Sequence, residues 1–177
     1  LGKAWHPLFA TEVFPQVLTF GAAIPCYTLN RAPQVRYTYN IKGLSLTLAA
    51  STQDDFKSMG PDGRSCSYLV NSGTPEFNAR IMYKADHFIV GIAGGYWTLK
   101  PQLLNNAGTK SEDLVSGMLL NAFAKANFNN FTIRGGYLMG ENVSQLMMFG
   151  GYGISEISST GDITYTTTKG NSVWADV

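Results

Sequence analysis

The feature that most constrains this chain is a strict alternation of apolar and polar residues with a period of two. In "QVRYTYNIK", residues 34–42, Val35, Tyr37, Tyr39 and Ile41 fall on one side and polar or basic residues fall on the other. The pair Lys42-Gly43 comes next, and "LSLTLAAS", residues 44–51, resumes the alternation. Side chains alternate across a strand, and two-residue loops join antiparallel strands, so this stretch predicts a β-hairpin.

The same pattern returns three more times along the chain. Residues 76–84 and 88–98 form a second predicted hairpin with a short turn near 85, and residues 114–139 form a third that turns at "NFNN". A last strand is predicted from Ser172 onward. About seven strands result, with no convincing helix apart from one turn near "NVSQLM". The sequence therefore predicts an all-β fold.

The connections between these strands alternate between short and long. Short turns fall near residues 42, 85 and 128, whereas long segments cover about 6–33, 53–74, 99–112 and 140–171. Short turns at one end and long loops at the other are typical of a transmembrane β-barrel. We therefore predict an antiparallel, up-and-down transmembrane β-barrel, with residues 1–177 as part of a single barrel domain and the four long segments as its outer loops.

Composition leaves one alternative to the barrel. Charged residues make up 14% of the chain, the net charge is +1, and the predicted apolar strand faces carry no charge. This gives no electrostatic case for nucleic-acid binding, and no run of 18 apolar residues predicts a membrane helix. An uncharged face also fits the core of a soluble β-sandwich, which in this case would bind carbohydrate through exposed aromatic residues.

The polar faces of the predicted strands carry the candidate functional residues. Arg36, Arg80 and Arg134 each lie about five residues from a short turn, which predicts a similar depth and a basic arc on a water-filled wall. The alternative is that these groups suit a membrane rim. Lys42, Lys84 and Lys125 lie closer to the turns and fit the rim better. Three loop carboxylates could face the arc if their loops fold inward, so the predicted pore-lining set is completed by Glu12, Asp54 and Asp55.

The segment 6–33 is too apolar for a loop that extends into water. It is rich in aromatic residues and prolines and carries little charge, which predicts irregular backbone packed on protein. We expect it to fold against the inner wall of the barrel or to lie under a neighbouring subunit. An ordinary surface loop with aromatic packing is the alternative.

No pattern of catalytic or cofactor-binding residues emerges from the sequence. His6 and His87 lack metal-ligand spacing, and no phosphate-loop, dinucleotide or nucleophile-elbow motif is present. We expect no enzymatic activity, no cofactor and no metal. Cys26 and Cys66 fall in predicted loops and either form a disulfide or remain two free thiols.

Several stretches resemble a family of outer-membrane porins from Bacteroidetes. They are "WHPLF", "NRAPQVRYTYNIKGLSLTLAASTQDDFKSMGPDGRS", "LMMFGGYGI" and "SVWADV". The resemblance implies a trimeric barrel of about 16 strands, of which this chain is a middle part, in the outer membrane of a Gram-negative bacterium. Its partners would be the lipid bilayer, lipopolysaccharide and other copies of itself.

By this resemblance the protein would let small hydrophilic solutes and ions diffuse passively across the membrane. A substrate-specific or hydrophobic-solute channel of the same topology is the alternative. It draws on four apolar residues at predicted lumen positions, Ile89, Trp97, Leu119 and Phe123.

Overall fold

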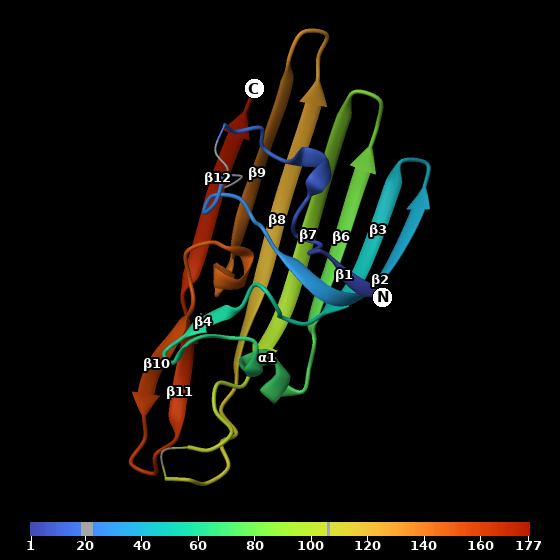
Figure 1. Cartoon of the computed structure of the whole chain (residues 1–177). Helices are drawn as coiled ribbons and strands as arrows, with labels where there is room; N and C mark the ends of the chain where they lie inside the picture. Colours follow the sequence, from blue (N-terminus) through green and yellow to red (C-terminus); the bar gives the residue numbers. More distant parts are fainter. Residues whose placement is uncertain (19–22, 106) are drawn as a thin grey trace.

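The computed structural model describes residues 1–18, 23–105 and 107–177. Within them, eight strands form one antiparallel sheet in the order β1-β2-β3-β6-β7-β8-β9-β12, so that neighbours in the chain are neighbours in the sheet (Figure 1). The bounds of these strands are β1 Gly2–Trp5, β2 Arg31–Ile41, β3 Leu44–Ser51, β6 Glu76–Lys84, β7 Phe88–Leu99, β8 Val115–Asn127, β9 Thr132–Glu141 and β12 Lys169–Asp176. The all-β, up-and-down prediction is confirmed. The sheet is open, however, with β1 and β12 at its edges.

The three predicted hairpins are confirmed, and their turns lie at one end of the sheet (Figure 1). At the first of them Lys42 and Gly43 both have positive φ values, 45° and 84°, which is the geometry of the two-residue turn that joins twisted strands. The long connections all leave from the other end of the sheet. They cover residues 6–30, 52–75, 100–114 and 142–168.

These long connections contain secondary structure that the sequence did not predict. Residues 52–75 hold the small hairpin of β4 (Ser58–Gly60) and β5 (Gly63–Ser65), followed by the helix α1 (Ser67–Ser72). The expectation of no helix here is wrong. With only six residues, α1 is too short to show helical periodicity, and its one signal is Gly73, which ends it in the left-handed conformation (φ 71°).

The last long connection is also more ordered than predicted. Residues 142–168 contain the 3-10 turn η2 (Val143–Leu146), where the sequence indicated one helical turn, and a second hairpin of β10 (Tyr152–Ile157) and β11 (Ile163–Thr167). That hairpin extends beyond the sheet at the loop end (Figure 1). β12 begins at Lys169, three residues before the predicted start.

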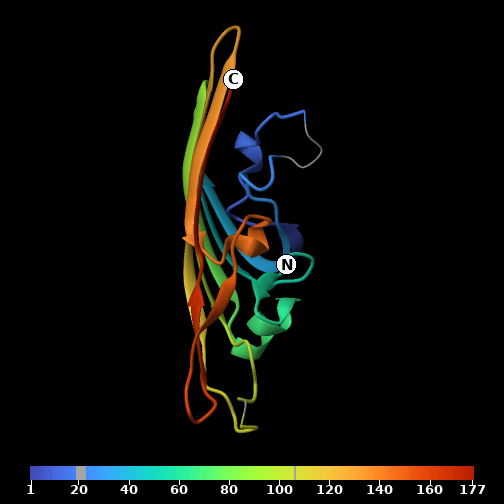
Figure 2. The ribbon, with the colours of Figure 1, turned by 90° about the vertical axis from the view of Figure 1, so that its left-hand side faces the viewer.

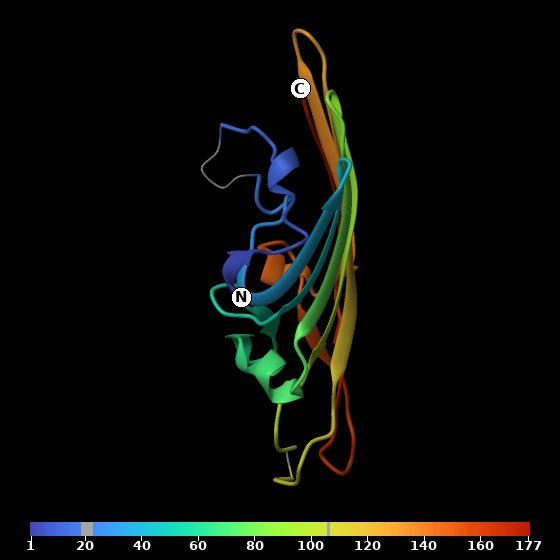
Figure 3. The same ribbon diagram turned by 90° about the vertical axis from the view of Figure 1, so that its right-hand side faces the viewer.

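All of these connecting segments that cover the sheet lie on the same face of it. Seen along its edges, the sheet is a single layer with α1, η2 and the 3-10 turn η1 (Thr11–Val13) on one side, and no described segment lies on the other (Figures 2 and 3). We call the covered side the inner face and the bare side the outer face. None of the described helices is long and apolar enough to cross a membrane.

The buried core lies between the inner face and these segments. One cluster packs Leu8 of the first long connection and Leu146 of η2 against Trp97 and Leu119 of the sheet. A second packs Ala10 and Val13 against Met82, Ile89 and Phe123.

Candidate functional site

The first long connection crosses the inner face of the sheet. We call residues 6–30 the inward segment, of which 6–18 and 23–30 are described. Leu8, Ala10 and Val13 are completely buried, as the sequence predicted for a segment packed on protein. Residues 19–22, inside the predicted loop 6–33, and residue 106, inside the predicted loop 99–112, lie outside the described residues.

The start of the inward segment is fixed by a buried polar pair. His6 Nε2 lies 2.8 Å from Glu76 Oε1 of β6, and the two side chains are 1% and 3% exposed. The backbone N–H of Leu8 donates to His6 Nδ1, so Nδ1 is an acceptor and Nε2 carries the proton that His6 donates to Glu76. No sequence pattern predicts this pairing, because the two residues are 70 positions apart.

An aromatic cluster stabilises the middle of the segment. Phe9 packs against Trp5, Phe14 and Tyr27, and Tyr27 packs edge-on against Trp174 of β12. Tyr27 also donates its hydroxyl to the backbone carbonyl of Ala10 at 2.8 Å. Burial raises the pKa of Tyr27, so the hydroxyl keeps the proton that it donates.

One ion pair and one hydrogen bond tie the segment to two different strands of the sheet. Glu12 in η1 lies 3.4 Å from Arg80 of β6. Further along, the backbone N–H of Gln16 donates to Asp176 of β12, whose other carboxylate oxygen lies 3.1 Å from Arg134 of β9. The segment therefore crosses the face from the β1 side to β12.

A polar cleft remains open beside η1, towards the hairpin turns. Its volume is about 830 Å³. Arg36, Arg80, Lys42 and Lys84 contribute its basic groups, Glu12 and Asp86 its carboxylates, and Thr38, Asn40, Ser45 and Thr47 most of its neutral polar groups. This cleft is the candidate functional site, since it combines charge of both signs with hydroxyl and amide groups on an open wall.

The structure corrects the predicted arc of three arginines. Arg36 and Arg80 line the same cleft, but Arg134 does not. The strand register shows that the arginines lie at different heights along the sheet. Arg80 lies in the same row across the strands as Asn121 of β8, whereas Arg134 pairs with Lys125, four residues further along β8. Equal spacing from the turns fails to align them because each hairpin is staggered relative to its neighbour (Figure 1).

The three predicted carboxylates also separate into two groups. Glu12 meets Arg80 as expected for an inward-folded segment. Asp54 and Asp55 instead pair with Lys3 of β1 at 2.9 and 2.6 Å, with about half of each carboxylate side chain exposed. Neither meets any of the three arginines. The partner of Arg134 is instead Asp176 of β12.

Four apolar residues predicted to line the lumen are covered by protein instead. Ile89, Trp97, Leu119 and Phe123 are on the inner face but are at most 7% exposed, beneath the inward segment and η2. They anchor these segments and offer no open apolar wall to a solute.

The described part of the chain contains neither a candidate metal site nor a disulfide. No three His, Cys, Asp or Glu side chains gather there to hold a metal ion. Cys26 and Cys66, both described, are free thiols.

The outer face has the opposite character. Large apolar side chains on it are exposed, including Val35 (61%), Tyr37 (62%) and Met118 (67%), and the same holds for Leu48, Phe77, Ile81, Val90, Ile92, Tyr96, Tyr137 and Met139. No described segment packs on them (Figures 2 and 3). The sheet thus has an inner face that is covered by protein except at the polar cleft, and an apolar, uncovered outer face.

In comparisons with known proteins, no family model, curated protein or solved structure matches the chain. The likeness to outer-membrane porins therefore stays a prediction from the quoted sequence stretches.

Proposed function

We propose that this chain is part of an outer-membrane porin, a closed β-barrel of about 16 strands through which small hydrophilic solutes and ions diffuse passively. The observation that carries the proposal is the contrast between the two faces of the sheet. Exposed apolar patches on soluble monomers rarely exceed a few hundred Å², and an uncovered face across eight strands would drive aggregation in water. Hydrocarbon is a solvent in which such a face is stable.

The spacing of aromatic residues on the outer face supports the same proposal. Phe88 and Tyr96 stand on this face eight residues apart on β7, which corresponds to about 27 Å along the strand. With the usual tilt of about 40°, this is about 20 Å along the membrane normal, comparable with the apolar band of about 25 Å between the aromatic girdles of such barrels. Tyr83, which contacts Phe88, marks the same level on β6.

The charged cleft on the inner face also supports the proposal, because in a closed barrel it would line a water-filled pore. Arg36, Arg80 and Glu12 supply fixed charges beside an inward segment that narrows the space over the sheet. Charged side chains on a pore wall control which ions and solutes pass. We assign no catalytic group, cofactor or metal to this site, and we place the protein in the outer membrane of a Gram-negative bacterium as a homo-oligomer, with three copies by the porin resemblance.

The barrel closes through strands that continue the sheet beyond β1 and β12. Their edges present unpaired backbone groups, which cannot face hydrocarbon because each such group costs several kcal/mol there. Closure is therefore a physical requirement of the membrane proposal.

Planar-bilayer recording of the full-length protein tests the proposal. Protein extracted from membranes should need detergent to stay in solution and should insert with stepwise, ohmic increases in conductance. Solubility without detergent together with no conductance would contradict it and would favour a soluble β module.

A further inference from the structure

The inward segment consists of two limbs that are hydrogen-bonded to each other. The outgoing limb, residues 6–13, carries Glu12, and the return limb, residues 27–30, leads into β2. Three bonds join the limbs: the His6 N–H donates to the Asn30 carbonyl at 3.0 Å, the Thr28 hydroxyl to the Leu8 carbonyl at 3.3 Å, and the Tyr27 hydroxyl to the Ala10 carbonyl at 2.8 Å. The position of Glu12 therefore depends on what holds the return limb.

The return limb is held by η2, a turn of the fourth long connection. The N–H of Leu29 donates to the carbonyl of Leu146 at 3.0 Å, and the side-chain amide of Asn30 donates to the carbonyl of Gln145 at 2.9 Å. Asn30 and Gln145 are 115 positions apart and are 2% and 0% exposed, so these bonds are made away from water. The first and fourth long connections are thus joined at a buried point.

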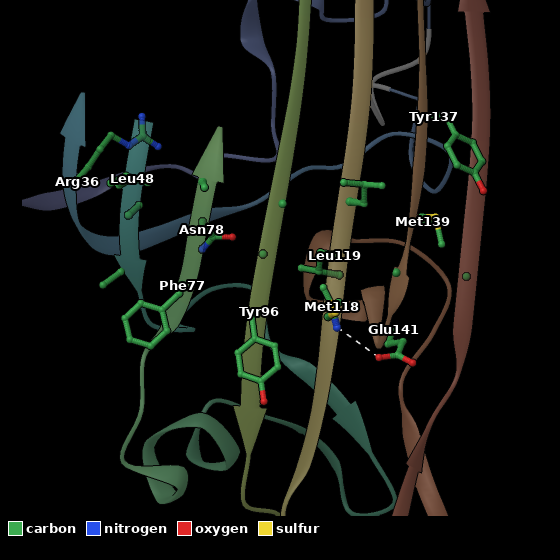
Figure 4. Close-up of a pocket in the computed structure, with 18 of the residues that line it drawn as sticks. Arg36, Leu48, Phe77, Asn78, Tyr96, Met118, Leu119, Tyr137, Met139 and Glu141 are labelled. Carbon is green, nitrogen blue, oxygen red and sulfur yellow. Dashed lines mark hydrogen bonds between the residues drawn. The ribbon is translucent and has the colours of Figure 1, made fainter. Parts of the chain in front are cut away.

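η2 itself is anchored in the core and to a third connection. Val143 and Leu146 belong to the same buried cluster as Leu119 of β8, behind which the coil of η2 lies in Figure 4. A network of neutral side chains, none more than 5% exposed, joins η2 to the second long connection. Its members are Gln53, Ser58, Asn142, Ser144 and Gln145.

Gln145 is the residue at which these three connections meet. Its backbone carbonyl accepts from Asn30 of the first connection, and its side-chain oxygen accepts from the amide of Gln53 in the second. Gln145 itself belongs to the fourth. A change at this one position should therefore affect how the return limb is supported.

Two features show that η2 is not placed by local preference. Asn142 and Met147, on either side of it, have positive φ values of 48° and 63°, a conformation that is unfavourable for methionine. The buried side-chain nitrogen of Gln145 has no hydrogen-bond partner among the described residues. Both features lower stability, and strained backbone concentrates at functional sites.

We propose that Gln145 is a positioning residue for the charged cleft. By joining η2 to the return limb and to the second connection, it keeps Glu12 beside Arg80. This inference rests on the proposed porin function, in which the Glu12–Arg80 pair influences ion preference.

Planar-bilayer recording of the full-length protein in a salt gradient measures the ratio of anion to cation permeability. Gln145→Met keeps the length of the side chain and removes its amide, and Asn30→Leu removes the donor to the Gln145 carbonyl. Each should raise the ratio about twofold, less than Glu12→Gln does, because the Glu12 charge is displaced and not removed. Asn105→Leu is the matched control: Asn105 is a buried asparagine bonded to Asp162 and to its own loop, and its loss should leave the ratio unchanged.

The sharpest comparison is made in the Glu12→Gln background. If Gln145 acts through Glu12, adding Gln145→Met to Glu12→Gln should cause no further change in the permeability ratio. An equal change in both backgrounds would overturn the proposal, because the effect would not depend on the Glu12 carboxylate. An unchanged ratio in both Gln145→Met and Asn30→Leu would also overturn it.

Hydrogen exchange separates failure of this inference from failure of the porin proposal. In Gln145→Met, backbone amides of both limbs should exchange at least about tenfold faster, while β8 keeps its wild-type protection. Wild-type protein without conductance would overturn the porin proposal, whereas unchanged exchange in both limbs would overturn only the positioning role. If Gln145→Met also loses protection in β8, Gln53→Met, which removes the same bond from its donor side, decides by the same two measurements.

Discussion

Glu12 and Arg80 are 68 residues apart in the chain, yet a carboxylate oxygen of Glu12 lies 3.4 Å from a guanidinium nitrogen of Arg80. The first belongs to the inward segment and the second to the wall of the sheet. Their pairing places one negative charge against a cleft otherwise dominated by basic groups, because Arg36, Lys42 and Lys84 line it too. The charge balance of the cleft therefore depends on how the inward segment is held.

Removing that carboxylate should change ion preference. Glu12→Gln keeps the size of the side chain and leaves Arg80 unpaired, so the reversal potential in a salt gradient should move towards anions. Charges act over about 8–10 Å at physiological salt, so only groups beside the limiting section should matter.

Asp54→Asn is the matched control for this change. It also removes one negative charge, but from an exposed pair with Lys3 that lies away from the cleft. Its effect on stability should be at most about 1 kcal/mol. Equal shifts of the reversal potential in both variants would mean that total charge, and not the cleft, sets ion preference.

The His6–Glu76 pair should be the most sensitive anchor of the inward segment. Glu76→Ala leaves the buried Nε2–H donor of His6 without its acceptor, and such a loss typically costs about 1–3 kcal/mol of unfolding free energy. Glu76→Gln retains an oxygen that accepts from His6 Nε2 and should cost about 1 kcal/mol. Unfolding in detergent, together with protease cleavage between Phe9 and Phe14, measures both. Fast cleavage in the wild type would mean that the segment is not packed as described.

Two glycines offer a further comparison of core packing. A Cβ at Gly117 would overlap the indole ring of Trp97, whereas at Gly153 there is nothing within 4 Å. Gly117→Ala must displace a fully buried tryptophan and should destabilise the fold by about 1–3 kcal/mol. Gly153→Ala should be close to neutral in the same unfolding measurement. If both were neutral, Trp97 would not be the tightly packed centre of its cluster.

The strands were predictable because apolar and polar residues alternate along each of them, so that each kind falls on its own face of the sheet. Tyr37, Leu48 and Ile81 fall on one face and Arg36, Thr47 and Arg80 on the other, and short turns such as Lys42-Gly43 fix the register. The site was less predictable, because its pairs join distant positions. Arg134 meets Asp176 because β9 pairs with β12, and Glu12 meets Arg80 because the inward segment crosses the sheet.

The interiors of the long connections were beyond sequence reasoning for a different reason. Six residues of α1 and three each of β4 and β5 are too few to establish a period. Their order comes from tertiary contacts, such as the hydrogen bonds from Gln53 to Ser58 and from Asn142 to Ser58. The alternation also gives no sign of which face is covered. The segments packed on the inner face supply that information.

Acid should loosen one loop contact selectively. Asp162 accepts hydrogen bonds from Asn105 at 2.9 Å and from Thr160 at 2.8 Å, and these bonds lower the pKa of its carboxyl group. Because the pKa of Asp162 is lower in the folded protein, the contact adds its full stability at pH values above the ordinary carboxyl pKa of about 4. That stability is lost as the pH falls from there through the lowered pKa.

Hydrogen exchange measures this contact. Protection of residues 103–105 and 107–111 should be constant from pH 8 to 5 and should fall below about pH 4. Asp162→Asn should remove that acid-dependent step. An unchanged step in Asp162→Asn would assign it to another carboxylate.

The most direct test of the account asks which face of the sheet meets lipid. Spin labels at Tyr37 and Ile81 report on the outer face, and labels at Thr38 and Asn40 report on the cleft side of the same sheet. In reconstituted full-length protein, the outer-face labels should be relaxed strongly by oxygen, which concentrates in hydrocarbon, and the cleft labels by a water-soluble nickel chelate. Preferential access of the nickel chelate to Tyr37 and Ile81 would show that the apolar face is not in the bilayer, and would contradict the membrane-barrel proposal.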